Sequence, residues 1–303
     1  MRALLLCALA LAPLTGWAAN LKVLALLSDD SAPYQSFANT LKKDMPDGIQ
    51  VTVLEHPDQL PHDILQIDLI VSVGLNAAKS AIAQSETPVL AAMVSRADYE
   101  ALLKQTLPTT TTVSISALYL DQPWARQIAF LRAALPERRR IGLLHSLDTQ
   151  IDFEQLRQVV AAQGGALVNQ PIQGADDLYP VLESVLTKSD VLLSIADSRI
   201  YNNGSIRNIL LTSYRLGVPL IGLSQAYVNA GALCAIFSTP EQLAAQTRAL
   251  VTAYAHNQEL PKPQYSTDFT ISVNQPVAQS LKIELSSPEA IRNRMSKKKG
   301  RAY

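Results

Sequence analysis

Short apolar runs alternate with segments of helical periodicity along almost the whole sequence. Most of the runs are five to seven residues long and rich in Val, Ile and Leu; they cover 21–27, 49–54, 68–73, 88–94, 141–145, 166–172, 190–196 and 219–223. Continuous apolar strands suit a sheet that helices cover on both faces. The alternation therefore predicts an α/β fold with parallel sheets and right-handed crossovers.

Apolar residues spaced three and four positions apart mark the helices between these runs, at 34–45, 124–135, 150–163, 176–188, 205–216 and 241–256. Asp121 precedes Pro123 before one of these helices, and Thr239 precedes Pro240 before another. A capping residue followed by an early proline is typical of a helix start, so we expect Asp121 and Thr239 to be N-caps.

The alternation breaks at residues 109–116, a polar and β-branched stretch. Such a stretch predicts an extended connector rather than a core strand. The chain of 303 residues also has the length at which single cores tend to divide. We therefore predict two α/β lobes, each with a doubly wound parallel sheet, joined near this connector.

Composition excludes several classes of protein. The 26 basic residues balance the 26 acidic ones, which argues against a nucleic-acid partner. An apolar fraction of 48% with 17% charged residues excludes a disordered chain. Two cysteines exclude a disulfide scaffold and a zinc ribbon.

The N-terminus predicts export. A basic start at Arg2 precedes an apolar stretch over 3–14, and small residues at Gly16 and Ala18 match a signal-peptidase site. About 12 apolar residues are too few to span a membrane as a helix. We expect residues 1–18 to be a signal peptide that is cleaved after Ala18, which places the mature protein in the periplasm. Cys234 then remains as the single cysteine, and its apolar surroundings predict a buried side chain.

The sequence lacks the motifs of common enzymes, including the phosphate-binding loop, the dinucleotide fingerprint, the hydrolase nucleophile elbow and the zinc-protease helix. Metal-type side chains gather at His56, Asp58, His62 and Asp63, but two prolines leave no helical register for them. His145 ends a predicted strand and is a candidate base for a hydrolase, the least favoured alternative. We expect no metal, no cofactor and no enzymatic activity.

Polar residues follow the predicted strands, where ligands bind in open α/β sheets. In the first lobe these are Ser28, Tyr34, Gly74 and Asn76; in the second they are Asp197, Tyr201, Asn202 and Ser224. Gly74 permits a sharp turn into a helix whose free N–H groups could hold an anion. Ordinary helix capping is the alternative explanation for each loop by itself.

Segments in the same order and spacing resemble a known family. They are 68–74 (DLIVSVG), 131–144 (with Pro136 and Arg140), 189–197 (SDVLLSIAD), 217–222 (GVPLIG), 228–233 and 269–274. Together they resemble the ABC transporter substrate-binding protein family, which has the type I periplasmic-binding fold.

The resemblance implies two lobes with three hinge crossings, near 113–118, 233–239 and 269–274. Residues 19–115 and 238–268 would then form lobe one, and residues 116–237 and 269–295 lobe two, followed by a basic tail at 296–303.

The resemblance also implies a function. A monomer would close its lobes on a small molecule, an amino acid or another small polar solute, for a membrane permease. By position, Asp197, Tyr201 and Asn202 would reach the ligand from lobe two, and Ser28, Tyr34 and Asn76 from lobe one.

The sequence departs from the family pattern in three ways, one of which is that the first lobe is small. Leu75 stands where relatives have a small hydroxyl residue, and 55–67 is too short and proline-rich for the usual helix. An exported sensor or accessory protein of the same fold, without transport coupling, therefore stays open as the alternative.

Overall fold

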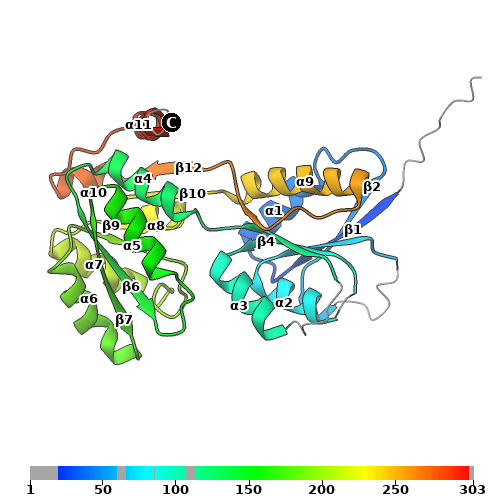
Figure 1. The fold of residues 1–303 in the computed structure, drawn as a ribbon, viewed down its shortest axis with the longest axis horizontal. Coiled ribbons are helices and arrows are strands. Elements are labelled where there is room, and N and C mark those ends of the chain that lie inside the picture. The colour runs from blue at the N-terminus through cyan, green and yellow to red at the C-terminus, as the bar shows by residue number, and fades with distance from the viewer. Residues whose placement is uncertain (1–19, 60–65, 85, 107–112, 300–303) are drawn as a thin grey trace, which may run out of the picture.

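Two lobes, each a sheet between helices, make up the protein (Figure 1). The computed structural model describes residues 20–59, 66–84, 86–106 and 113–299. The predicted signal peptide, His62, Asp63, residues 109–112 and the end of the basic tail lie outside these ranges. No helix in the described part is long and apolar enough to cross a membrane.

The first sheet has the order β11-β5-β4-β3-β1-β2, and all of its paired strands are parallel. Its strands are β1 (Leu21–Leu27), β2 (Ile49–Leu54), β3 (Leu69–Val73), β4 (Val89–Val94), β5 (Ile115–Tyr119) and β11 (Gln264–Tyr265). The helices of this lobe are α1 (Ala32–Lys42), α2 (Leu75–Gln84), α3 (Arg96–Thr106) and α9 (Pro240–Asn257). A single turn of 3-10 helix covers Pro57–Gln59.

Helices cover both faces of the first sheet. Val23 and Leu27 belong to a core cluster with Phe37 of α1 and Leu243 of α9. Leu24 belongs to a separate cluster with residues of α2 and α3, among them Ala78 and Tyr99. Because side chains alternate between the faces of a strand, an apolar run such as β1 contributes residues to the cores on both faces of the sheet.

The second sheet has the order β12-β10-β9-β8-β6-β7. Its strands are β6 (Arg140–Ser146), β7 (Ala166–Ile172), β8 (Val191–Leu193), β9 (Leu220–Gly222), β10 (Cys234–Phe237) and β12 (Thr270–Val273), the last of which is antiparallel to β10. Its helices are α4 (Trp124–Ala134), α5 (Phe153–Ala162), α6 (Leu178–Leu186), α7 (Ile206–Arg215), α8 (Gln225–Ala230), α10 (Gln275–Ser280) and α11 (Pro288–Lys299), and a 3-10 turn covers Ala175–Asp177. The predicted fold class, two lobes with mostly parallel sheets, is confirmed.

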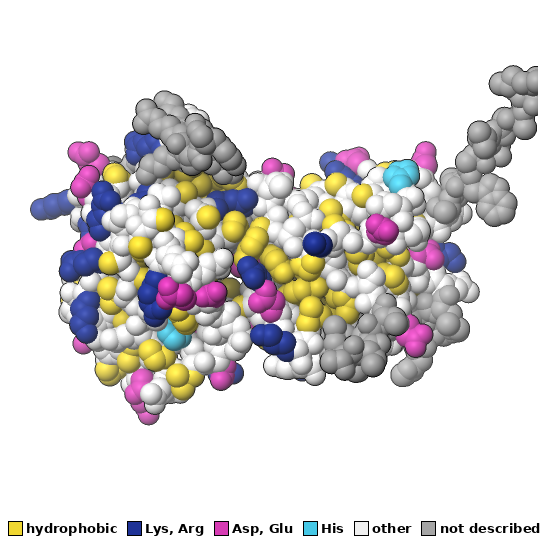
Figure 2. All heavy atoms as spheres, in the orientation of Figure 1, with side chains coloured by type: hydrophobic (Ala, Val, Ile, Leu, Met, Phe, Trp, Pro, Cys, Tyr) yellow, Lys and Arg dark blue, Asp and Glu magenta, His cyan; other side chains and the backbone are white. Residues whose placement is uncertain are grey.

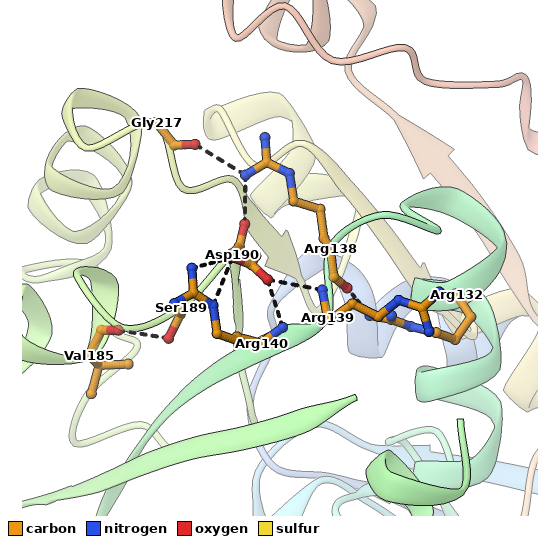
Figure 3. Close-up of polar contacts among 8 residues, drawn as sticks. All are labelled: Arg132, Arg138, Arg139, Arg140, Val185, Ser189, Asp190 and Gly217. Atoms are coloured by element: carbon orange, nitrogen blue, oxygen red, sulfur yellow. Dashed lines mark hydrogen bonds and ion pairs between the residues drawn. The ribbon is translucent and has the colours of Figure 1, made fainter. Parts of the chain in front are cut away.

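Asp190 fixes the start of two neighbouring strands in this lobe (Figure 3). One carboxylate oxygen accepts hydrogen bonds from the backbone N–H groups of Arg139 and Arg140, at 3.0 and 2.8 Å. The other oxygen pairs with the Arg140 guanidinium at 2.7 Å. These residues lie at the amino ends of β6 and β8, so the motif over 189–197 begins with a structural bridge.

Three segments connect the lobes: 120–123 after β5, 238–239 after β10, and 266–269 after β11. The first segment corrects two predictions. Ile115–Tyr119 is a mostly buried strand of the first sheet rather than a connector, so the boundary expected after residue 115 runs through β5. The polar character of the stretch that precedes β5 concealed this strand.

Thr239 caps α9 as predicted, in a reciprocal capping box with Gln242. The prediction for Asp121 was wrong. The N-cap position of α4 is Pro123, which has no side-chain cap, and Asp121 instead accepts a hydrogen bond from the backbone N–H of Arg96 at 2.8 Å. Asp121 therefore joins the first crossing to the start of α3.

Candidate functional site

A cavity of about 240 Å³ lies between the lobes, at the carboxyl ends of β4, β5, β8 and β9. Both lobes line it, together with the first crossing. Figure 2 shows this waist of the molecule, where hydrophobic side chains meet charged ones of both signs. The carboxyl ends of parallel strands are where ligands bind in α/β proteins, so this cavity is the candidate site.

The second lobe supplies most of the apolar lining. Trp124, Ile151 and Leu223, which are half-buried, line the cavity, and so do the buried Phe130 and Phe237. The polar residues that this lobe adds come mainly from the loop before α5, where Asp152 accepts a hydrogen bond from Gln155 N–H and caps the helix. A flat or apolar body of a solute would pack against this wall.

The first lobe and its crossing supply charged groups. Arg96, Glu100 and Asp121 line the cavity, and the Arg96 guanidinium bonds Glu100 at 2.7 Å. Hydrogen bonds to Glu100 and then to Tyr265 raise the pKa of Arg96, so it stays a cation. Met93 has a positive φ of 55° where the register between β4 and β5 shifts, two residues before the strand reaches the cavity at Ser95. An irregularity of this kind bends the strand and changes the direction in which the residues at its end point.

Asp121 has the most perturbed carboxyl group at the site. Burial raises its pKa to about 6, although the backbone hydrogen bond from Arg96 acts in the opposite direction. A buried carboxylate is stabilised when a cation comes within a few ångströms of it. Asp121 is therefore suited to pair with a positively charged group of a ligand.

A second cavity, of about 340 Å³, adjoins the first and shares Thr149, Gln150 and Ile195 with it. Asp197 and Tyr201, both predicted as site residues, line this second cavity. The Tyr201 side chain is buried, and its hydroxyl has no hydrogen-bond partner among the described residues.

The Asp197 carboxylate is already engaged within the protein. One oxygen accepts hydrogen bonds from Ser146 N–H, at 2.8 Å, and from the Thr149 hydroxyl; the other accepts from Arg199 N–H at 3.1 Å. Burial by itself would raise the pKa of Asp197, but these donors outweigh it and the pKa is lowered. Asp197 therefore holds the loops after β6 and β8 together as an anion.

Replacing Asp197 with alanine is expected to weaken solute binding at least about tenfold and to lower the free energy of unfolding by about 2 kcal/mol, because buried donors lose their acceptor. The stability loss should shrink as the pH falls through the lowered pKa of Asp197, because the protonated carboxyl is a weaker acceptor than the carboxylate. Calorimetric titration and urea unfolding measure the two effects. Unchanged affinity would exclude Asp197 from the site.

The four candidates of the first lobe form a group of their own. The Ser28 hydroxyl accepts a hydrogen bond from Ala77 N–H at 2.9 Å, at the start of α2. Gly74 has a φ of +89°, and a Cβ there would lie 2.5 Å from the Tyr34 hydroxyl oxygen. Burial and the nearby Asp29 raise the pKa of Tyr34, so the phenol stays neutral. Ser28, Tyr34, Gly74 and the exposed Asn76 lie outside the linings of both cavities.

Two candidates of the second lobe also lie outside these linings. The Asn202 amide donates to the backbone oxygens of Ser198 and Arg199, at 3.0 and 3.3 Å, and so shapes its own loop. Ser224 is half-buried at the N-cap position of α8, without a side-chain cap bond.

Of the residues considered for catalysis or metal binding, the described ones, His56, Asp58 and His145, lie outside the linings of both cavities. His145 is nearly buried, with its Nδ1 3.1 Å from the Ser146 carbonyl oxygen and its ring 4.3 Å from that of Phe153. Cys234 is buried within β10, as expected. Among the residues that the structure describes, no three His, Cys, Asp or Glu side chains could hold a metal ion together.

Sequence reasoning missed Arg96, Asp121 and Trp124 as site residues. Ser95 and Arg96 do follow a predicted strand, which was a usable signal. Asp121 was explained as a helix cap and Trp124 as a helix start, so their position at a crossing between lobes stayed hidden.

Comparison with known proteins shows the family to which the chain belongs. The model of the family described as "ABC transporter substrate binding protein" matches residues 50–298. No curated protein matches the chain significantly.

Three similar solved structures support the same fold. A Clostridium difficile substrate-binding protein with adhesive properties, in a ligand-free, open structure, has a TM-score of 0.67 and 17% identity over 89% of this chain and 97% of that one. The ABC domain from Streptococcus pneumonia, in complex with L-Trp, has a TM-score of 0.64 and 14% identity over 91% and 98%. A periplasmic solute-binding protein from Actinobacillus succinogenes, with bound D-allose, has a TM-score of 0.51 and 16% identity over 86% and 99%.

Proposed function

The chain belongs to the ABC transporter substrate-binding protein family, and on that premise we propose that it is a periplasmic protein that closes its lobes on an amino acid. The family is non-enzymatic and typically extracytoplasmic, and membership implies a small-molecule ligand and an ABC transporter partner. In this proposal the protein is a monomer that is released by cleavage near Ala18 and delivers its solute to a permease. The observation that carries it is a cavity lined by both lobes and by the crossing between them.

The chemistry of the lining supports an amino acid with an apolar side chain. Asp121 offers a carboxylate to an ammonium group, and Arg96 offers guanidinium N–H groups to a carboxylate. Trp124, Ile151 and Leu223 offer apolar surface to a side chain on the opposite side. The zwitterionic backbone of an amino acid matches the charged part of the lining, and its apolar side chain matches the apolar part.

The similar structures are compatible with more than one solute class. The Streptococcus pneumonia protein is in complex with L-Trp, and the Actinobacillus succinogenes protein holds D-allose. A sugar would use the polar groups of the lining but would bring no cationic partner to Asp121. The lining therefore favours the amino acid.

Calorimetric titration with L-tryptophan, L-phenylalanine and L-leucine tests this proposal, together with tryptamine, indole-3-propionate and D-allose. We expect at least one of the three amino acids to bind. Its analogue without the ammonium group should bind at least about tenfold more weakly, because Asp121 then stays unpaired. Binding of D-allose without any amino acid would contradict the proposal.

Asp121→Asn is expected to weaken amino acid binding at least about tenfold, since the amide keeps the hydrogen-bond acceptor but removes the charge. The matched control is Asp152→Asn, which removes a carboxylate from the same cavity while asparagine still caps α5. Equal losses for both variants would assign the effect to the general negative potential of the cavity and would contradict the direct pairing.

A further inference from the structure

The three segments that cross between the lobes are tied together by buried polar side chains. The Gln122 amide, in the first crossing, donates to the Ser238 hydroxyl oxygen in the second crossing at 2.9 Å. The Ser238 hydroxyl donates to the carbonyl oxygen of Asp268 in the third crossing at 2.6 Å. Gln122 and Ser238 are each 4% exposed, so water has little access to these bonds.

Arg126 of α4 closes the network from the second lobe. Its Nη1 donates to Gln122 Oε1 at 2.5 Å and to the Ser266 carbonyl oxygen at 2.7 Å, which joins the first crossing to the third. The guanidinium also lies 5.0 Å from the centre of the Phe269 ring. Burial lowers the pKa of Arg126, while the nearby Asp268 acts in the opposite direction.

Gln246 of α9 holds the third crossing from the first lobe. Its Oε1 accepts hydrogen bonds from Thr267 N–H at 3.0 Å and from the Ser266 hydroxyl at 3.1 Å. Each lobe thus contributes at least one side chain that bonds the third crossing. Rotation of one lobe against the other must displace these partners relative to each other.

The network also reaches the candidate ligand cavity. Gln122 lines the cavity next to Asp121, and its backbone oxygen accepts a hydrogen bond at 2.7 Å from Gln127, another lining residue. A solute that contacts this wall touches the residue that joins the crossings.

We propose that Gln122, Ser238 and Arg126 form a hinge latch, and that Gln122 couples occupancy of the cavity to the position of the lobes. A buried hydrogen bond that breaks during rotation finds no water to replace its partner, so the latch resists rotation until ligand contacts offset it. Gln122 is a positioning residue in this scheme. The inference rests on the proposed closure of the lobes and is independent of the identity of the ligand.

The test compares Ser238→Ala with the wild type in the absence of any solute. Ser238 lies outside the cavity lining, so this substitution removes two hydrogen bonds of the latch without changing the residues that line the cavity. Spin labels at Lys79→Cys of α2 and Glu183→Cys of α6 report the separation of the lobes, because both positions are exposed and Cys234 is buried. The loss of one such hydrogen bond corresponds to about a fivefold change in population, so we expect the population outside the wild-type distance range to rise at least about fivefold in Ser238→Ala.

Ser189→Ala is the matched control. Its buried hydroxyl donates to the Val185 carbonyl oxygen at 2.7 Å, within the second lobe and away from the crossings (Figure 3). This variant should keep the wild-type distance distribution. A change of the same size in both serine variants, or no change in Ser238→Ala, would overturn the latch.

A second measurement separates this inference from the proposed function. If the wild-type lobes move when a binding solute is added but Ser238→Ala matches Ser189→Ala, the latch fails and the solute-binding function stands. If Ser238→Ala broadens the solute-free distribution while none of the tested amino acids binds, the latch stands and the proposed ligand fails.

Discussion

Gly222→Ala is expected to lower the free energy of unfolding by about 3 kcal/mol, because it forces rigid atoms together. A Cβ at Gly222 would lie 2.5 Å from the Cβ of Tyr227 and 3.2 Å from the Cβ of Ala232. Neither neighbour can rotate away, since a Cβ is fixed by its own backbone. Helix α8, which carries Tyr227, must move, and the cavity wall at the end of β9 moves with it.

Gly174→Ala is the control for this substitution. A Cβ at Gly174 meets no atom within 4 Å, so the exchange adds a methyl group without a collision. We expect a change within about 0.5 kcal/mol, as for ordinary surface substitutions. The urea midpoints of the two variants, compared at an unchanged m-value, give the difference. Equal stabilities would mean that α8 adjusts freely and would contradict the tight contact.

Binding of the amino acid should weaken about tenfold between pH 7 and pH 5, because Asp121 must be ionised to pair with an ammonium group. The pKa of this carboxyl is raised to about 6, mainly by burial; Arg96 lowers it and Asp98 raises it. About nine-tenths of the free protein therefore carries a protonated Asp121 at pH 5, and binding must expel that proton. Calorimetric titrations in buffers of different ionisation enthalpy should detect the release.

Asp121→Asn supplies the control for the pH profile. Its affinity should be low and nearly independent of pH between 5 and 7. The raised pKa also has a consequence for stability: the wild type without ligand loses stability as the pH rises from 4 to 6, since the ionised carboxylate is disfavoured in the folded state. At pH 7.5 the ligand-free Asn variant should therefore melt at a higher temperature than the wild type. A pH-independent wild-type affinity would contradict the role of Asp121.

Much of the fold could be predicted from the sequence because buried parallel strands are continuous apolar runs. The bounds of β1, β2 and β7 match the predicted runs residue for residue. β5 was missed because it follows a polar, β-branched stretch, and because its side chains pack against neighbours that no local pattern identifies. The short strands β10 and β12 lie beside the crossings, and their pairing depends on the way the chain returns between the lobes.

The candidate site was predicted only in outline. The rule that ligands bind beyond strand ends identifies the correct edge of each sheet, but each sheet has several strand ends. Which of them line the cavity depends on the angle between the lobes, and the crossings set that angle. Ser28 and Gly74 follow β1 and β3, whereas the cavity lies beyond β4 and β5, nearer the crossings. Asp121 belongs to a crossing and precedes a helix. In the sequence, an aspartate at such a position cannot be distinguished from an ordinary N-cap.

If the lobes close on a solute as proposed, the division of the cavity lining between them has a kinetic consequence. A solute with an apolar body can first settle on Trp124, Ile151 and Leu223, which belong to one half of the molecule. Arg96 of the first lobe and Asp121 of the first crossing would then contact the head group as the lobes approach each other. Such a protein would select its solutes in two stages, by the fit of the apolar body on arrival and by the contacts of the head group with Arg96 and Asp121 on closing. A hydrocarbon of suitable shape would pass the first stage and leave again without completing the second.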